Sequence, residues 1–152
     1  MENIKWEYKQ FSALTSAELY NILTLRNEVF VVEQNCIYLD TDNKDQHAWH
    51  LLGYINDKLV AYSRILPPGV SFHEASIGRV VTHSSIRRNG IGNELMKESI
   101  KKTINQFEVT DIRIGAQCYL IKFYTSLGFA IAGNEYMEDE IPHVEMLFKI
   151  KK

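Results

Sequence analysis

A run of β-branched residues at 80–82 passes through a short polar turn into two closely spaced glycines and then into a helical pattern. Gly90 and Gly92 remove Cβ atoms where a backbone can approach a bulky anion. The helix that begins beside them presents free N–H groups and the positive end of its dipole. This strand, turn and helix predict an anion site, and a pyrophosphate is the expected ligand.

Strand and helix patterns alternate along the rest of the chain. Thr15 and Glu18 have the spacing of a capping box that begins a helix, and the helical pattern after the glycines places its apolar residues on one side. The predicted strands cover 4–9, 49–55, 59–66, 75–82, 109–116 and 143–150, and the predicted helices cover 15–30, 91–104 and 119–127. This order predicts a mixed α/β (α+β) fold in which antiparallel strands flank strand-helix-strand units.

The composition restricts the classes of protein to which the chain can belong. With 152 residues, of which 45% are hydrophobic, we expect a single domain over 1–152 with a sizeable core. The net charge of −2 gives no general attraction to nucleic acid or to an anionic membrane, so the predicted anion must bind locally. The sequence has no pattern of a signal peptide or a membrane span, and we expect a cytoplasmic location.

Spacing separates the motifs that could explain the two glycines. A Walker loop needs Lys followed by Ser or Thr after its glycines, and a dinucleotide fingerprint needs a third glycine where this chain has Leu95. The remaining pattern, Arg87-x-x-Gly90-x-Gly92, resembles the pyrophosphate-binding signature of the GNAT acetyltransferase family. An ordinary strand-to-helix turn rich in Gly and Asn is the alternative.

A second segment, at 117–129, resembles the same family. Its Phe123-Tyr124-x-x-x-Gly128-Phe129 ending is similar to the family segment in which a helix carries a tyrosine towards the cofactor sulfur and a glycine turns the chain into the next strand. Further segments resemble the ElaA-like acetyltransferases, namely 25–36, 40–51, 77–81 and 140–146. The resemblance implies a strongly bent mixed sheet with helices on both faces, in which two central parallel strands splay apart to hold acetyl-CoA.

The resemblance also implies which residues bind the cofactor and lie beside the acceptor. Gln117 stands where many relatives have an asparagine, which is a departure from the family pattern. The expected cofactor-binding residues are Val80, Val81, Thr82, Arg87, Arg88, Asn89, Gly90, Ile91, Gly92, Asn93 and Gln117. The expected substrate-binding residues are Arg26, Glu33, Gln34 and Glu140, and the alternative for Arg26 is a structural ion pair with a neighbouring carboxylate.

The catalytic assignments follow from the reaction that the resemblance implies. Coenzyme A leaves as a thiolate, and Tyr124 is the expected general acid that gives it a proton. The acceptor amine must lose a proton before it attacks, and no spacing selects the base that removes it. The residues available for this role are Glu33, Asp45, Glu74, Glu140 and His143, of which we take Glu74 and His143 as candidates.

Two further groups of residues indicate other chemistry that we do not favour. The Asp40, Asp42, Asp45, His47, His50 group offers oxygen and nitrogen ligands in one short loop. Lys44 breaks the calcium-loop register, however, and two histidines three apart do not complete a zinc site, so we expect no metal. Cys118 with His143 resembles a nucleophile and base, but direct attack needs no thiol and an isolated cysteine is most often a small buried hydrophobe.

The sequence therefore predicts an N-acetyltransferase that moves an acetyl group from acetyl-CoA to a primary amine of a small molecule or peptide by direct attack in a ternary complex. The alternative is a noncatalytic domain that binds or senses acyl-CoA. The expected partners are acetyl-CoA and an amine acceptor, with no nucleic acid and no membrane. Uncovered sheet edges in such folds can pair between chains, which allows a homodimer.

Overall fold

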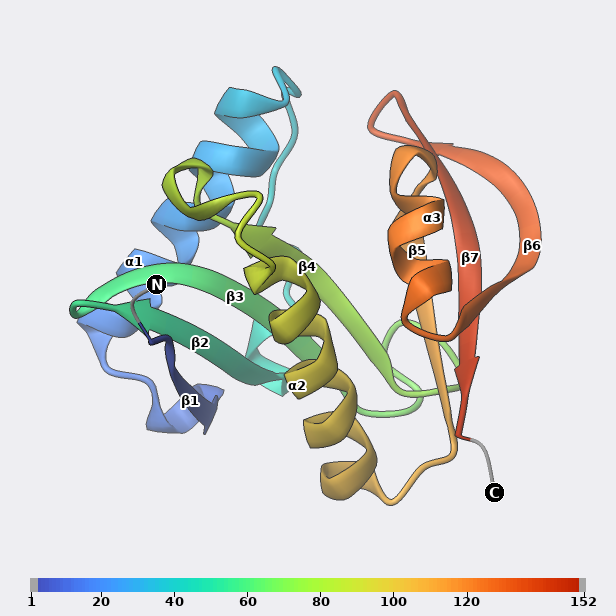
Figure 1. Ribbon diagram of the computed structural model, residues 1–152, viewed down its shortest axis with the longest axis horizontal. Helices are drawn as coiled ribbons and strands as arrows, with labels where there is room; N and C mark the ends of the chain where they lie inside the picture. Colours follow the sequence, from blue (N-terminus) through green and yellow to red (C-terminus); the bar gives the residue numbers. More distant parts are fainter. Residues whose placement is uncertain (1–2, 151–152) are drawn as a thin grey trace.

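The computed structural model describes residues 3–150, which form two antiparallel sheets (Figure 1). The first sheet has the strand order β1-β2-β3-β4 and the second has the order β5-β7-β6. The strands of the first sheet are β1 (Lys5–Gln10), β2 (Trp49–Ile55), β3 (Lys58–Leu66) and β4 (Ser76–Thr82). Those of the second sheet are β5 (Asp111–Gln117), β6 (Phe129–Glu138) and β7 (Ile141–Lys149).

The two sheets meet where β4 approaches β5, and the two strands then separate. They run parallel and share a single bridge among the described residues, between Ala75 and Ile112, where Arg113 N–H donates to the Ala75 carbonyl at 3.0 Å. From this bridge the strands diverge towards Thr82 and Gln117 (Figure 1). The predicted mixed fold with splayed central parallel strands is thus confirmed.

Helices connect the strands and cover both faces of the first sheet. The longer helices are α1 (Ser16–Arg26), which continues into a π-helix η2 (Asn27–Glu33), α2 (Ile91–Phe107) and α3 (Ile121–Ser126). Single 3-10 turns are η1 (Phe11–Ala13), η3 (Asp45–His47), η4 (Ser84–Ile86) and η5 (Cys118–Leu120). The predicted capping box begins α1, because Glu18 N–H donates to Thr15 Oγ1 at 3.1 Å and Thr15 N–H donates to Glu18 Oε1 at 2.8 Å.

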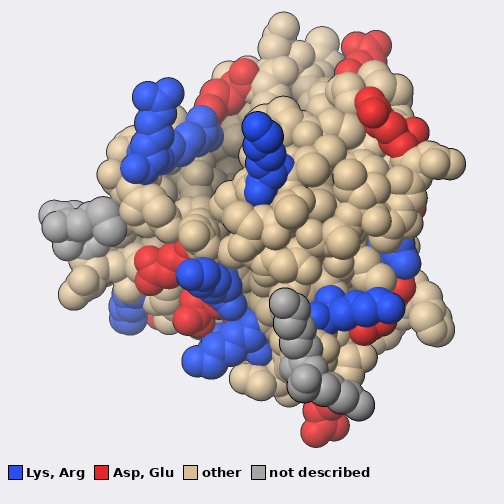
Figure 2. All heavy atoms as spheres, turned by 45° about the vertical axis from the view of Figure 1, so that its right-hand side comes forward, with Lys and Arg blue, Asp and Glu red and all other residues tan. Residues whose placement is uncertain are grey.

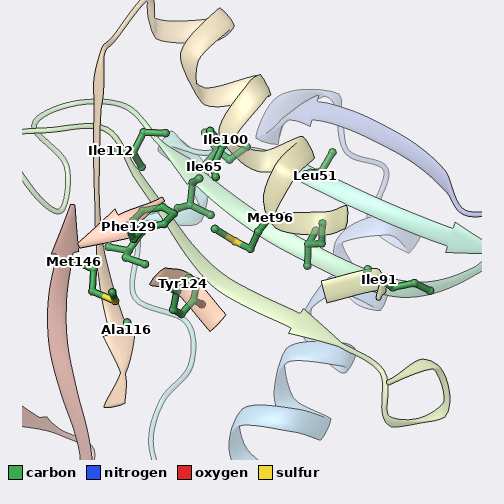
Figure 3. Close-up of a cluster of buried hydrophobic side chains, with 14 of the residues drawn as sticks. Leu51, Ile65, Ile91, Met96, Ile100, Ile112, Ala116, Tyr124, Phe129 and Met146 are labelled. Carbon is green, nitrogen blue, oxygen red and sulfur yellow. The ribbon is translucent and has the colours of Figure 1, made fainter. Parts of the chain in front are cut away.

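Alternation along β2 and β3 divides the core into two clusters. Leu51 lies in a cluster with Leu95 of α2, whereas its neighbour Leu52 lies in a cluster with Ile22 of α1. Because successive side chains of a strand point to opposite faces, α1 and α2 cover opposite faces of the sheet. Figure 3 shows the larger cluster, in which Met96 of α2 and Met146 of β7 belong to one core, so side chains fill the space between the two sheets near their junction.

The main departure from the predicted elements is β6, to which the hydrophobic pattern assigned no strand. β6 lies at the edge of the second sheet and is exposed along most of its length, so its residues lack the alternation that marks a half-buried strand. The family resemblance did imply a strand directly after Gly128, and β6 begins there. No helix within residues 3–150 is long and apolar enough to cross a membrane.

A buried ion network fastens the segment between η2 and β2 to the first sheet. Arg26 is fully buried, and its guanidinium donates to Asp40 Oδ2 at 2.7 Å and to Asp45 Oδ1 at 2.8 Å. Arg64 of β3 donates to Asp42 Oδ1 at 2.7 Å and to Asp45 Oδ1 at 3.0 Å. The aspartates of the predicted loop therefore bind arginines.

This network changes the assignment of Arg26, and it lies beside a histidine of the same segment whose nitrogens are both engaged. Arg26 is not a substrate-binding residue, because its side chain has no exposed surface and is held by carboxylates; the alternative of a structural ion pair is correct. His50 is engaged on both nitrogens, since Nε2 donates to the Asp45 carbonyl at 3.0 Å and Nδ1 accepts from the Tyr62 hydroxyl at 2.7 Å. Burial lowers the pKa of His50 and favours this neutral form.

We expect Arg26→Met to lower the free energy of unfolding by about 3–5 kcal/mol, because it removes a fully buried cation that pairs with two buried carboxylates. Urea denaturation measures the change. Lys9→Met is the control: it breaks the partly exposed ion pair between Lys9 and Glu18 and is expected to lower the free energy of unfolding far less, because solvent screens this pair. Equal losses in the two variants would contradict a structural role for the buried network.

Candidate active site

A cavity of about 1070 Å³ lies where β4 and β5 have separated. One wall is formed by β4 and η2, and the other by β5, α3 and the hairpin of β6 and β7. Lys and Arg side chains lie around a hollow in the upper part of the face drawn in Figure 2. The strands meet at one end and open at the other, so a long ligand can enter between them without disturbing a ladder.

The double-glycine turn lies at the edge of this cavity and begins α2. Gly90 is the N-cap residue and has a φ of +77°, a conformation that favours glycine. Gly92 has no such requirement, and a Cβ added there would meet only Phe123, at 3.9 Å. Its missing side chain instead leaves space in the cavity wall beside the N-terminus of a 17-residue helix. This geometry suits an anion that needs both room and N–H donors.

Arg87 is the cation of the turn that faces the cavity. Its Nη2 donates to the Thr82 carbonyl at 3.0 Å, and its Nη1 pairs with Glu33 of η2. Both side chains of this pair are partly exposed, so the ion pair is weak and an entering anion can compete for the guanidinium.

The predicted cofactor-binding residues divide into two groups. Those that line the cavity are Val80, Val81, Thr82, Arg87, Gly92 and Gln117, while Arg88, Asn89, Gly90, Ile91 and Asn93 do not. Ile91 is a core residue packed with the α2 cluster. Arg88 has a φ of +69° and is exposed on the outer side of the turn, which explains why two adjacent arginines differ in their surroundings.

Tyr124 brings a hydroxyl into the cavity from α3. Its ring is buried against Phe123 and Phe129, with ring centroids 5.1 and 5.8 Å away, respectively. Within residues 3–150 the hydroxyl has no hydrogen-bond partner, although the side chain lines the cavity. Burial raises the pKa of Tyr124, so the phenol keeps its proton at neutral pH and can donate it to a ligand.

His143 lies in the hairpin wall of the same cavity. Its Nδ1 is 2.7 Å from the Ile141 carbonyl oxygen, which can only accept, so Nδ1 carries the proton and Nε2 of the neutral ring has a free lone pair. Glu138 Oε2 is 3.4 Å from Nε2, and the Tyr136 ring stacks on the imidazole with centroids 5.7 Å apart. An imidazolium formed by protonation at Nε2 would therefore lie beside the Glu138 carboxylate.

A close approach fixes the position of Tyr136. A Cβ at Gly115 of β5 would lie 2.6 Å from the Tyr136 hydroxyl, so only glycine at this position lets the phenol lie over β5. The sequence analysis missed Tyr136 and Glu138, since it placed no strand there. Their spacing of two along a strand, together with His143 on the paired strand, is the signal that could have found them.

Two of the residues predicted to lie beside the acceptor line the cavity, and Glu140 does not. Glu33 and Gln34 line the cavity, and the Gln34 and Gln117 amides bond to each other at 3.3 and 3.4 Å across the opening. Glu140 lies outside the lining, whereas its neighbours Glu138 and Asp139 lie within it. The turn between β6 and β7 therefore contributes acidic groups, although not at the predicted residue.

Glu74 is not brought to this cavity. It lies near the closed end of the gap, where Arg113 donates to its two oxygens at 3.1 and 3.0 Å. These hydrogen bonds lower the pKa of Glu74, which makes the carboxylate a weaker base. Cys118 also lies outside the lining, and partial burial raises the pKa of its thiol, so the geometry does not favour a cysteine nucleophile.

The comparisons with known proteins agree with this architecture. The family model of the acetyltransferase (GNAT) domain matches residues 16–150. A UPF0039 protein of Schizosaccharomyces pombe is 40% identical over 99% of this chain and 100% of its own length. The crystal structure of Escherichia coli ElaA is 38% identical, covers 97% of this chain and 100% of its own, and has a TM-score of 0.90.

A second solved structure, described as an acyl-CoA N-acyltransferase from Pseudomonas aeruginosa, is 36% identical to this chain. The match covers 96% of this chain and 99% of the other, with a TM-score of 0.91. The similarity therefore extends over both sheets and over all the elements that form the cavity. On this evidence the chain belongs to the GNAT acetyltransferase family, among the relatives of ElaA and the UPF0039 proteins.

Proposed function

We propose that this protein transfers an acyl group, and specifically acetyl, from acetyl-CoA to a primary amine by direct attack in a ternary complex. The observation that carries the proposal is a single cavity that joins an anion-binding turn to a buried phenol without a partner and to an imidazole with a free lone pair. The relative from Pseudomonas aeruginosa, named an acyl-CoA N-acyltransferase, supports the same class of reaction.

The coenzyme would enter through the open end of the gap. Its pyrophosphate suits the N-terminus of α2 and the fork of Arg87, which can bond two phosphate oxygens. The pantetheine arm then runs between β4 and β5, past the Gln34 and Gln117 amides. This path ends with the thioester near the Tyr124 hydroxyl.

The acceptor amine needs a base, because an ammonium has no lone pair and an alkylamine has a pKa of about 10.4. His143 Nε2 can take the proton while Nδ1–H continues to donate to the Ile141 carbonyl. Glu138 then stabilises the imidazolium. The amine nitrogen attacks the carbonyl carbon, and the carbon–sulfur bond breaks. The thiolate takes a proton from Tyr124, and the phenolate is restored by the second proton that the nitrogen loses as the amide forms.

The direct test is calorimetry with acetyl-CoA, followed by a thiol-release assay over a library of primary amines. Binding together with amine-dependent release of free coenzyme A supports the proposal. Binding without release for any amine would instead favour the noncatalytic alternative.

Arg87→Ala is expected to weaken coenzyme A binding about 10-fold, because a charge-assisted hydrogen bond to phosphate is lost. Arg88→Ala removes the neighbouring charge outside the cavity and is the control, with an expected change within about twofold. Glu33→Gln is expected to strengthen binding about two- to fivefold, since Arg87 no longer has to leave an ion pair. Calorimetry measures all three, and an unchanged affinity in Arg87→Ala would refute the assignment.

Tyr124→Phe is expected to lower kcat about 100-fold and to leave the coenzyme A Kd within about twofold, because the ring packing stays and only the proton donor is lost. Single-turnover kinetics isolates the chemical step. Tyr20→Phe, at a tyrosine that is 73% exposed on α1, is the control and should behave as the parent protein. If Tyr124→Phe turns over at the parental rate, the phenol is not the acid.

His143→Asn is expected to lower kcat about 100-fold at pH 7, because the amide can still donate to the Ile141 carbonyl but cannot accept a proton. Activity in this variant should rise with pH as the free-amine fraction of the acceptor grows. Glu138→Gln should give a smaller loss, since it weakens only the stabilisation of the imidazolium. A pH profile of His143→Asn that matches the parent profile would exclude His143 as the base.

A further inference from the structure

An irregularity in β4 lies at the centre of the cavity wall. The register pairs Tyr62 with Val81 and Arg64 with Gly78, so two steps along β3 correspond to three along β4. β4 thus carries one extra residue, and Arg79 and Val80 have no partner residue on β3. β5 has already separated from β4 here, and both residues line the cavity, so this part of the β4 backbone lies beside any ligand in it.

The bulge depends on a backbone conformation that Arg79 does not favour. Arg79 has a φ of +47°, in the left-handed region that is unfavourable for a residue with a Cβ. Glycine would adopt it without this cost, and the adjacent Gly78 does not take it up: the positive φ falls on the arginine instead. Interactions of the Arg79 side chain must therefore compensate for the strain.

Those interactions come from the aspartate segment. Arg79 Nη2 donates to the Asp40 carbonyl at 2.9 Å and to Asp42 Oδ2 at 3.3 Å. Arg79 Nε is 3.0 Å from Asp40 Oδ1, but its N–H does not point at this oxygen. The contact is therefore an ion pair and not a hydrogen bond. The guanidinium is thus held at two aspartates more than 35 residues away in the sequence.

The aspartates are themselves held in place, which makes them a rigid support. Arg26 Nε and the Tyr38 hydroxyl donate to the two oxygens of Asp40, each at 2.7 Å. Burial raises the pKa of Asp42, but the hydrogen bond and charge of Arg64 and the charge of Arg79 outweigh it and lower the pKa to about 2. The network thus joins three arginines to three aspartates, whose formal charges balance.

We propose that Arg79 is a positioning residue: its ion pairs with Asp40 and Asp42 hold the β4 bulge so that the backbone N–H groups at Arg79 and Val80 polarise the thioester carbonyl and stabilise the oxyanion. The inference rests on the proposed acyl transfer. It also gives a function to the aspartate segment, whose role the sequence left open.

The test uses acetyl-CoA labelled with ¹³C at the thioester carbonyl and bound in the absence of an amine. Difference infrared spectroscopy reports the carbonyl stretch, which moves to lower wavenumber when N–H groups donate to it. The parent protein should show this shift, Arg79→Ala should lose it, and Arg79→Gly should fall between them, because glycine tolerates the conformation but does not enforce it. In single-turnover assays kcat should fall about 100-fold in Arg79→Ala, with the acetyl-CoA Kd within about twofold.

Arg113→Ala is the matched control. The Arg113 side chain is 20% exposed, against 23% for Arg79, and the substitution also removes two ion pairs. Arg113 lies on β5, however, and has no contact with the β4 bulge in these pairs. It should keep the parental carbonyl band. If Arg79→Ala fails to fold, Arg79→Lys replaces it, since lysine keeps the charge and loses the two-point contact; its band should shift less than that of the parent.

The outcomes separate this inference from the proposed function. A carbonyl band that stays shifted in the Arg79 variants overturns the positioning role, whether or not an amine is acetylated. A shift that is lost in Arg79→Ala but kept in Arg113→Ala supports it, even if no amine in the library reacts and the proposed function fails. If the parent protein does not bind acetyl-CoA, both are overturned.

Discussion

The separation of β4 from β5 is the constraint on which the other features depend. Two parallel strands that meet at one bridge and then diverge leave two backbone edges that cannot satisfy each other. Within residues 3–150 the cavity lies in this gap, and its walls include the two strands and elements that follow them. The turn into α2 follows β4, and η5 with α3 follows β5, so the double-glycine turn and the Tyr124 side chain face one space.

Ion pairs between three arginines and three aspartates hold the segment after η2 in place beside this gap. Four of these six charged groups, Arg26, Asp40, Asp45 and Arg64, are buried, and burying a charge is costly unless it has a partner. The network therefore acts as a unit that ties the segment after η2 to both β3 and β4. Under the proposed positioning role of Arg79, the network matters for geometry more than for net stability, since a hydrophobic replacement of equal volume could stabilise the fold equally well.

The motifs of the sequence predicted the donor side of the site better than the acceptor side. Arg87, Gly92 and Tyr124 belong to short local patterns, and the structure brings all three to the cavity. Arg26 was placed on the acceptor side because its helix forms that wall, but the angular position of a residue on a helix depends on packing. Tyr136 and Glu138 were missed because an exposed edge strand carries little hydrophobic periodicity.

The sequence by itself determined the local structure of this protein: the capping box of α1, the left-handed glycine that begins α2 and the order of strands and helices follow from backbone preferences and from periodicities of 2 and 3.6 residues. Only the tertiary structure decided which charged and polar groups meet. The Gln34 and Gln117 amides are 83 residues apart, and the Cys36 thiol and the Asp139 carbonyl that it contacts are 103 apart. Such contacts arise from the packing of whole elements and from the cost of burying an unpaired charge, which no local pattern records.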